Sequence, residues 1–310
     1  MLGNFNSSPL AARSTVSGNH TMSASPSRGI DAHNHFWAYS KEQYPWMGPQ
    51  HAPIAQDYGP SHLQPLLASA SLRGSIAVQA RQSLEETEAL LALAEAHPAA
   101  ILGVVGWVEL CAPPAALAKQ LDGFASRPAL KGVRHVVHDE EDDAFMLRPT
   151  FRAGIGALAA RGLAYDLLIF PKHLPAALAL VAEFPAQRFM VDHIAKPRVC
   201  AGGGPPDAAW LAGMRALAAH PNVHVKLSGM VTEHAAGAGW AAEDFYPYLD
   251  ALLESFGARR LAYGSDWPVC LLAASYAGQH GIVAGWAAAR LSEEEAAGVM
   301  GGNAAAFYRL

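Results

Sequence analysis

The chain of 310 residues contains 51% hydrophobic and 16% charged residues, a composition that indicates a globular protein with a large core and excludes a disordered chain. Its formal net charge of −5 provides no basic surface for binding nucleic acid or anionic lipid, and no apolar run is long enough to span a membrane. We therefore expect a small-molecule partner, and homo-oligomer formation is left open.

The leader, residues 1–28, bears on the domain organisation of the chain. Residues 1–28 are rich in Ser and Asn and lack the continuous apolar segment of a secretory signal. We expect them to form a disordered or loosely attached leader, with a single domain over residues 29–310.

Cys111, Cys200 and Cys270 are odd in number, widely spaced and never arranged as C-x-x-C, so no disulfide framework is expected. This cysteine usage suits a reducing cytoplasm.

The first predicted strand covers residues 29–37 and carries the first cluster of chemistry. Because successive side chains of a strand point to opposite faces, we expect Asp31, His33 and His35 to share one face. Two imidazoles on one face can hold a single zinc or similar divalent ion. A His-x-His pair is also common at ordinary strand ends, so the pair alone leaves both interpretations open.

A long loop is expected over residues 36–65. It carries four aromatic residues among prolines and glycines, namely Tyr39, Tyr44, Trp46 and Tyr58. Long loops in compact domains are commonly functional, so this one either forms an aromatic wall over a polar pocket or packs as ordinary core.

A strand-then-helix unit recurs along the rest of the chain. Further strands are predicted at residues 74–81, 101–109, 131–135, 163–169, 188–193, 223–228 and 261–266, and helices at 83–96, 152–161 and 174–184. Eight apolar strands with helical crossovers predict an α/β fold with an all-parallel sheet, which closes into a single-domain (β/α)8 TIM barrel. An open doubly wound sheet is the alternative, but residues 202–205 (GGGP) lack the G-x-G-x-x-G spacing of a nucleotide site.

Polar residues gather at the predicted carboxyl ends of these strands, where such barrels place their active sites. They are His33, His35, Gln79, Arg81, Glu109, Arg134, His135, Asp166, His193, Lys226, Ser228 and Asp266. Each residue alone fits a surface or capping role. Three imidazoles and a carboxylate from strands one, six and eight nevertheless have the composition of a hydrolytic metal site.

Several motifs together resemble the amidohydrolase superfamily: the His-x-His pair and residues 191–197 (VDHIAKP), 226–229 (KLSG), 263–268 (YGSDWP) and 302–304 (GNA). Within it, the chain is similar to lactone hydrolases of the L-fuconolactonase and 2-pyrone-4,6-dicarboxylate lactonase type, from about residue 29 to residue 310. The resemblance implies hydrolysis of a small lactone, with a sugar lactone such as L-fucono-lactone expected, to the open hydroxy acid.

The resemblance also implies roles for particular residues. It makes His33, His35 and His193 ligands or carbonyl-polarising groups, and it makes Asp266 both a ligand and the base that activates water. These four would hold one divalent ion, with zinc expected. Superfamily members with two metals often carry a modified lysine at the end of the fourth strand, where this chain has Arg134 followed by a histidine, so at most one metal is expected. Some lactonases of this branch are thought to work without a metal, which leaves metal-independent catalysis open.

Substrate contacts are expected from cationic residues at the mouth. Arg81, Arg134 and Lys226 could bind substrate hydroxyls or the developing carboxylate, because a guanidinium fork suits planar oxyanions. Lys226 could equally pair with a carboxylate in the barrel wall.

Further substrate contacts are expected from four other side chains. We expect Glu109 at the mouth, as a hydroxyl-binding group or a further ligand. Trp46 and Trp267 are expected to flank the ring, with simple packing as the alternative. Tyr165 and the next residue cannot share a face, and Tyr165 is expected to point inward.

Three other functions compete with lactone hydrolysis. A decarboxylase of an unsaturated carboxylic acid in the same superfamily would use a similar ligand set. A TatD-type phosphodiesterase would need two metals and a basic mouth, and a third possibility is a barrel that only binds a sugar acid. The chain has no G-x-S-x-G elbow, which argues against a serine esterase.

Overall fold

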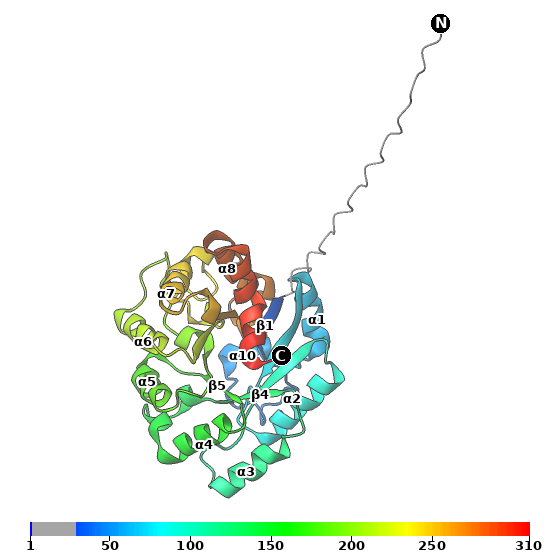
Figure 1. Cartoon of the computed structure of the whole chain (residues 1–310), viewed down its shortest axis with the longest axis vertical. Coiled ribbons are helices and arrows are strands. Elements are labelled where there is room, and N and C mark those ends of the chain that lie inside the picture. The colour runs from blue at the N-terminus through cyan, green and yellow to red at the C-terminus, as the bar shows by residue number, and fades with distance from the viewer. Residues whose placement is uncertain (2–28) are drawn as a thin grey trace.

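The computed structural model describes Met1 and residues 29–310, so the expectation for the leader lies outside the described residues. Eight strands form one sheet in which each strand pairs in parallel with the next: β1 (Gly29–Asn34), β2 (Leu72–Val78), β3 (Ile101–Gly106), β4 (Leu130–His135), β5 (Ala164–Leu167), β6 (Phe189–Val191), β7 (Val223–Leu227) and β8 (Leu261–Tyr263). The ring closes where the amide of Asp266 donates to the carbonyl of His33 at 2.8 Å. The predicted (β/α)8 barrel is confirmed (Figure 1).

Helices surround the strands in Figure 1: α1 (Pro60–Ser69), α2 (Leu84–Ala96), α3 (Pro114–Gly123), α4 (Pro149–Ala159), α5 (Leu174–Glu183), α6 (Ala208–Ala218), α7 (Tyr246–Phe256), α8 (Tyr276–Arg290) and α9 (Glu293–Ala297). The expected start of α2 is confirmed, because the hydroxyl of Ser83 accepts a hydrogen bond from the amide of Glu86 at 3.0 Å. The expected loop over residues 36–65 was too long. It contains a 3-10 helix, Pro49–Ile54, and α1 begins at Pro60, where a proline at the first helical position fits well.

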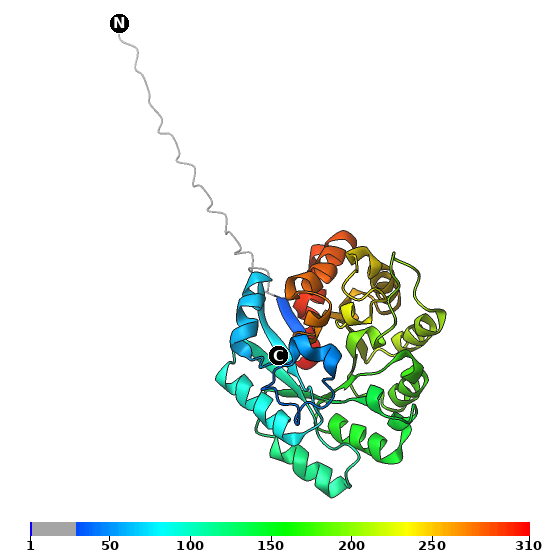
Figure 2. The same cartoon turned by 180° about the vertical axis from the view of Figure 1, so that it is seen from behind.

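The apolar core has two parts. The larger part lies between the outer faces of the strands and the helices, and the smaller part fills the inside of the barrel. One end of the barrel is closed by the short helix α10 (Asn303–Tyr308), which lies across the middle of the strand ring in Figure 1. Seen from behind, the blue segment that follows β1 crosses the opposite end (Figure 2). The barrel is thus plugged at one end, and its mouth lies at the other.

The predicted alternation along β1 fails at Asp31. Between Asp31 and Asn34 the strand advances three residues while β2 advances two, from Ser75 to Ala77. The extra residue is a β-bulge, which re-aims the side chains that follow it. The carboxylate of Asp31 consequently accepts a hydrogen bond from the hydroxyl of Tyr276 on α8 at 3.0 Å and does not share a face with the two histidines.

The expected inward orientation of Tyr165 is also wrong. Its ring packs in the outer core against Phe151 of α4, with the ring centroids 5.7 Å apart. The neighbouring Asp166 faces the inside of the barrel instead, where it pairs with Lys226.

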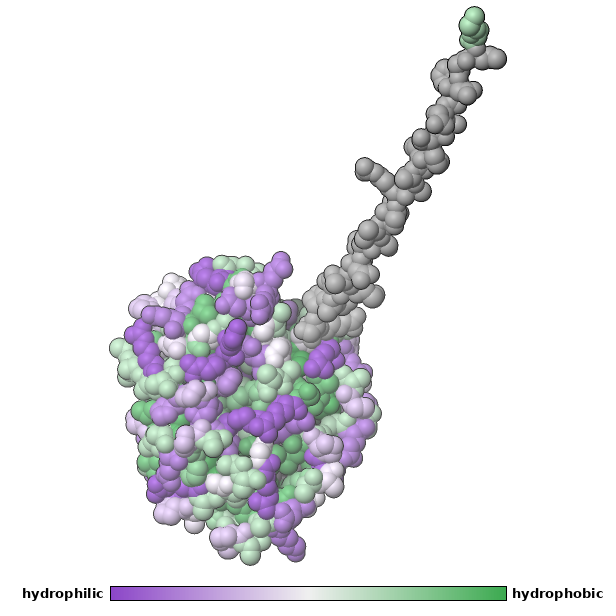
Figure 3. All heavy atoms as spheres, in the orientation of Figure 1, coloured by the Kyte–Doolittle hydropathy of each residue, from purple (hydrophilic) through white to green (hydrophobic). Residues whose placement is uncertain are grey.

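Two further observations concern the outer surface. None of the helices within the described residues combines the length and the apolar character needed to cross a bilayer. The face shown in Figure 3 carries hydrophilic and hydrophobic residues interspersed with one another. That face carries no continuous apolar patch of the kind that marks a docking surface.

Candidate functional site

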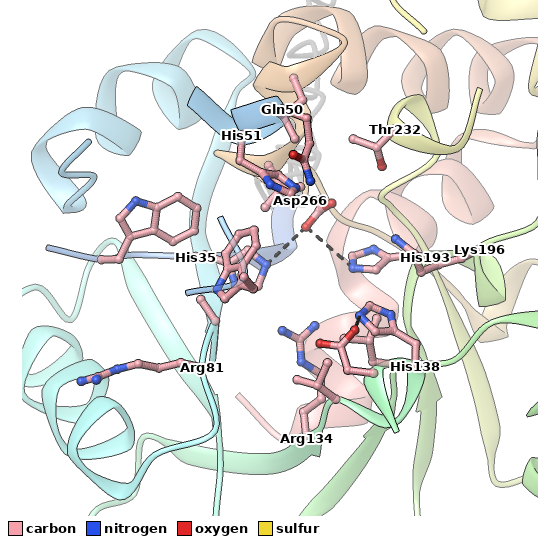
Figure 4. A pocket seen from close by; sticks show the side chains of 18 of the residues that line it. His35, Gln50, His51, Arg81, Arg134, His138, His193, Lys196, Thr232 and Asp266 are labelled. Carbon is pink, nitrogen blue, oxygen red and sulfur yellow. Dashed lines mark hydrogen bonds and ion pairs between the residues drawn. The ribbon is translucent and has the colours of Figure 1, made fainter. Parts of the chain in front are cut away.

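The three predicted histidines converge on the carboxylate of Asp266 at the mouth of the barrel. Oδ1 of Asp266 lies 3.3 Å from Nε2 of His35 and 3.7 Å from Nε2 of both His33 and His193. Nε2 of His33 is in turn 3.3 Å from Nε2 of His35. All four residues are at most 4% exposed. Side chains that lie more than 200 residues apart in sequence therefore present their polar atoms to one point (Figure 4 shows three of them).

Nδ1, the ring nitrogen that faces away from Asp266, has a different partner in His35 and in His193. Nδ1 of His35 lies 2.8 Å from the carbonyl of Val78, and because a carbonyl only accepts, the proton lies on Nδ1. Nδ1 of His193 is 2.9 Å from the hydroxyl of Ser228. Partners of this kind orient metal-binding histidines and leave Nε2 free to act as a ligand.

The donor set fits a divalent ion. Nε2 of His35 and the carboxylate of Asp266 are both acceptors, so their close approach leaves lone pairs that a cation would satisfy. Bonds of about 2.0–2.1 Å in a tetrahedral zinc site place ligand atoms about 3.3–3.4 Å from one another, close to the separations seen here. Burial lowers the pKa of His193 to about 4 and lowers that of His33 well below its usual range, so both rings are neutral at pH 7, as ligands must be.

A second group, His33, Asp192 and His193, also brings possible ligand atoms together. Its carboxylate is already paired with two cations, because Asp192 lies 3.0 Å from both Arg134 and Lys226. Burial alone would raise the pKa of Asp192, but Lys226, His33 and Arg134 together hold it well below its usual range. The carboxylate is therefore an ionised partner of the two cations. The candidate metal site is the group of His33, His35 and Asp266, with His193 3.7 Å from Asp266 beside it.

The backbone around His193 is left-handed over four consecutive residues. The φ angles of His193, Ile194, Ala195 and Lys196 are 53°, 49°, 60° and 49°. Each such residue costs about 1–2 kcal/mol when it is not glycine. The turn is held by burial of Ile194 and by a 2.8 Å hydrogen bond from the indole of Trp210 to the Ile194 carbonyl. Strain of this kind is concentrated at functional sites, where it aims side chains.

Replacing Trp210 with Phe should therefore loosen the turn that aims His193. We expect a loss of about 1–2 kcal/mol in the free energy of unfolding, measured in urea, because the buried Ile194 carbonyl loses its donor. The matched control is Trp286→Phe, which removes a 2.8 Å bond from an equally buried indole to Asp250, on the outer layer of helices. Both variants should lose stability, but only Trp210→Phe should lose about tenfold in kcat. Equal kcat values in the two variants would contradict the proposal that this turn aims His193.

A cavity of about 940 Å³ opens above the cluster. His35, His193 and Asp266 lie in its lining, and His33 is buried beneath them. The walls come from the segment after β1, with Trp46 and its neighbours, and from the loops that follow β2, β4, β6, β7 and β8. Figure 4 shows the labelled side chains around this space. The cavity is large enough for a small ring-shaped molecule to reach Asp266.

The structure separates the residues predicted at the mouth into two groups. Trp46, Arg81 and Arg134 line the cavity. Arg134 is buried and lies next to Asp192, whereas the guanidinium of Arg81 lies over the ring of Tyr44, 5.7 Å from its centroid.

Four of the predicted contacts do not line the cavity. Lys226 is fully buried in the barrel, where its ammonium lies 2.6 Å from Asp166, so the barrel-wall alternative describes it correctly. Trp267 packs edge-on against Tyr58, with the centroids 5.0 Å apart, and Tyr165 faces the helices. The carboxylate of Glu109 accepts from the amide of Cys111 in its own loop, at 3.3 Å. Contacts elsewhere in the fold thus hold these four side chains, and the packing alternative also describes Trp267 correctly.

The sequence did not indicate three residues of this site: Asp192, which pairs with two buried cations, and Lys196 and His138, which line the cavity. Asp192 lies beside a predicted ligand, and strict alternation would have turned it away, but β6 ends at Val191 and the turn brings both residues inward. Lys196, in the same motif, lines the cavity and pairs with Glu233 at 2.5 Å. His138 also lines the cavity, stacked on a phenylalanine, and nothing in the sequence around it indicated this.

Comparison with known proteins places the chain among close relatives. A model of the amidohydrolase family matches residues 30–310. The chain is 42% identical to an L-fucono-1,5-lactonase of Burkholderia multivorans, over 91% of this chain and 96% of the relative, and 38% identical to an L-fucono-1,5-lactonase of Burkholderia ambifaria, over 91% and 95%. A crystal structure of a Burkholderia multivorans amidohydrolase with bound zinc superimposes with a TM-score of 0.85 at 43% identity, covering 91% of this chain and 99% of that one.

Proposed function

The chain belongs to the amidohydrolase family, and we propose that it is a lactonase that hydrolyses a small sugar lactone, L-fucono-1,5-lactone, to the open hydroxy acid. The observation that carries the proposal is the convergence of three histidines and Asp266 at the mouth of the barrel. Two relatives that are 42% and 38% identical over 91% of this chain are L-fucono-1,5-lactonases. The cavity above the cluster, of about 940 Å³, is large enough for a sugar ring, and Asp266 lies in its lining.

We assign Asp266 the role of general base. Burial acts to raise its pKa, but His193, His35 and His33 outweigh burial and lower it below the usual range, so the side chain is a carboxylate at neutral pH. It takes a proton from water as the water oxygen bonds to the lactone carbonyl carbon. It then returns the proton to the ring oxygen as the carbon–oxygen bond of the ring breaks. The products are a free hydroxyl group and a carboxylic acid, which releases a proton to the solvent.

Arg134 is the group best placed to stabilise negative charge that develops on the carbonyl oxygen. It lines the cavity and is only 3% exposed, so its charge acts in a site with little water. Bonds to Gln79 and Asp192 fix the direction of its guanidinium. A preoriented donor costs no rearrangement at the moment of reaction. The indole of Trp46, which also lines the cavity, is suited to flank the ring.

A divalent ion, with zinc proposed, would be held by His33, His35, His193 and Asp266. When bound there, the ion would supply a Lewis acid that polarises the carbonyl and raises the acidity of water, which suits a base whose pKa is as low as that of Asp266. Burial keeps His33 and His193 neutral at pH 7, which is the protonation state that an ion requires of its ligands.

Proton release from a lactone panel tests the proposed reaction. The purified chain is expected to open L-fucono-1,5-lactone far faster than the spontaneous reaction, and L-galactono- and D-arabinono-lactones more slowly. Carbon dioxide release from unsaturated carboxylic acids is measured in parallel, because a decarboxylase would act on those acids and leave the lactones at their spontaneous rate. Saturable binding of the lactones without turnover would instead indicate a barrel that only binds sugar acids.

A further inference from the structure

A buried chain of polar side chains connects the plug of the barrel with the candidate site. It begins at Tyr308, the last residue of α10, whose hydroxyl donates to both carboxylate oxygens of Asp166 on β5, at 2.7 and 2.9 Å. Asp166 accepts in turn from the ammonium of Lys226 on β7, at 2.6 Å. The ammonium also lies over the Tyr308 ring, 5.4 Å from its centroid. Tyr308 is 1% exposed and the other two are fully buried.

The chain continues from Lys226 to the first predicted ligand. The Lys226 ammonium lies 3.0 Å from Oδ1 of Asp192 and 3.3 Å from Nδ1 of His33. The same oxygen of Asp192 lies 3.4 Å from Nδ1 of His33. On the other side of the ring, Nε2 faces Arg134, which only donates. Each ring nitrogen of His33 therefore faces a cation that only donates and a carboxylate. These are Lys226 and Asp192 at Nδ1, and Arg134 and Asp266 at Nε2.

Charge balance explains why every member of this chain matters. Two carboxylates, Asp166 and Asp192, surround the Lys226 ammonium, and all three side chains are fully buried. Burial raises the pKa of Asp166 to about 6, while Lys226 and the Tyr308 hydroxyl act to lower it. Without that hydroxyl, the Asp166 carboxylate loses the donor that holds it in place, so the ammonium bound to it can shift relative to Asp192 and His33. A change at the plug would thus reach the ring that faces the cavity.

We propose that Tyr308, acting through Asp166 and Lys226, is a positioning residue that fixes the orientation of the His33 ring for lactone hydrolysis. This inference rests on the proposed function. Tyr308 touches neither the cavity nor the reacting atoms, and its influence passes only through the side chains described above. The hydroxyl therefore affects the chemical step and the affinity for an ion, and does not affect the fit of the substrate.

The variant Tyr308→Phe tests the proposal, because it removes the hydroxyl and keeps the ring in place. Groups bonded directly to a metal-binding histidine change metal affinity or activity by about 10–100-fold. For this more distant group we expect kcat to fall about fivefold, KM to change by less than twofold, and the Kd for zinc alone, measured by competition with a chelating dye, to rise about fivefold. The side-chain ¹⁵N shifts of His33 in the zinc-free protein should differ from those of the parent protein.

The matched control is Tyr165→Phe. It makes the same chemical change on β5, next to Asp166, where the hydroxyl is buried and has no hydrogen-bond partner. We expect kcat, the zinc Kd and the His33 shifts of the control to match those of the parent protein. Tyr308→Phe with parental values in all three measurements, or with changes equal to those of Tyr165→Phe, would overturn the proposal. The zinc and ¹⁵N measurements need no substrate, so they remain decisive even if the parent protein opens no lactone.

Discussion

The variant Asp266→Asn is expected to lose about 10³-fold in kcat for lactone opening, while its fold and thermal unfolding stay close to those of the parent protein. General-base catalysis contributes about 10²–10⁴-fold, and the amide cannot accept the proton of the attacking water. The side chain keeps its size and can still contact Nε2 of His35, now 3.3 Å from the carboxylate. Proton release measured under saturating lactone gives kcat, and circular dichroism checks the fold.

The control for this variant is Asp142→Asn. Asp142 forms an exposed ion pair with Arg148 at 3.0 Å, and exposed pairs of this kind contribute little to stability. Its kcat should equal that of the parent protein. A parental kcat in Asp266→Asn would refute the assignment of Asp266 as the base and would direct attention to another group at the mouth.

The second large effect is expected from Gly229→Ala. Gly229 has a φ of +60°, and a Cβ built on it would lie 2.4 Å from Nδ1 and 2.5 Å from Cγ of His193. No real Cβ approaches other atoms so closely, so the ring would have to leave its place between Ser228 and Asp266. A displacement of about 1 Å at a catalytic group can cost about 10²-fold, and we expect a fall of that size in kcat. A loss of about 1 kcal/mol or more in the free energy of unfolding should accompany it.

The variant Gly202→Ala separates the effect of the positive φ from the effect of the contact with His193. Gly202 also has a positive φ, +79°, but nothing lies within 4 Å of the Cβ that would be built there. We expect this control to lose a similar amount of stability and to keep its kcat. If both variants kept full activity, the position of His193 would not matter for turnover.

The fold was largely predictable from the sequence because it depends on buried apolar runs. Strands such as Ile101–Gly106 and Phe189–Val191 are covered on both faces, so they stand out as hydrophobic segments between helical stretches. The same logic located His33, His35, His193 and Asp266, because chemistry in a barrel is concentrated where strands end. What the sequence could not supply was the backbone geometry beyond those ends. The left-handed turn at His193 and the φ of +57° at Asp266 depend on tertiary packing.

The errors have different physical causes. Strict alternation fails at a bulge beside Asp31 and at the early end of β6. Tyr165 was placed inward because it was treated as a possible substrate contact, yet the pleat gives that face to Asp166, whose charge finds a partner only inside the barrel. Pairings such as that of Lys226 with two carboxylates join strands distant in sequence, so no local pattern could predict them.

The site derives its chemistry from how little freedom its side chains have. Each ring that faces Asp266 is held from behind: His33 by Asp192, His35 by Val78 and His193 by Ser228. A rigid arrangement of this kind lowers the cost of reaching the transition state, because few groups must reorganise during the reaction.

A crystal structure of the protein with zinc and the open acid of L-fucono-1,5-lactone would test the proposed active site most directly. We predict zinc bound by the three histidines and Asp266, with the carboxylate of the acid beside that cluster and within reach of Arg134. An acid carboxylate bound outside the 940 Å³ cavity, or zinc bound by other residues, would contradict it.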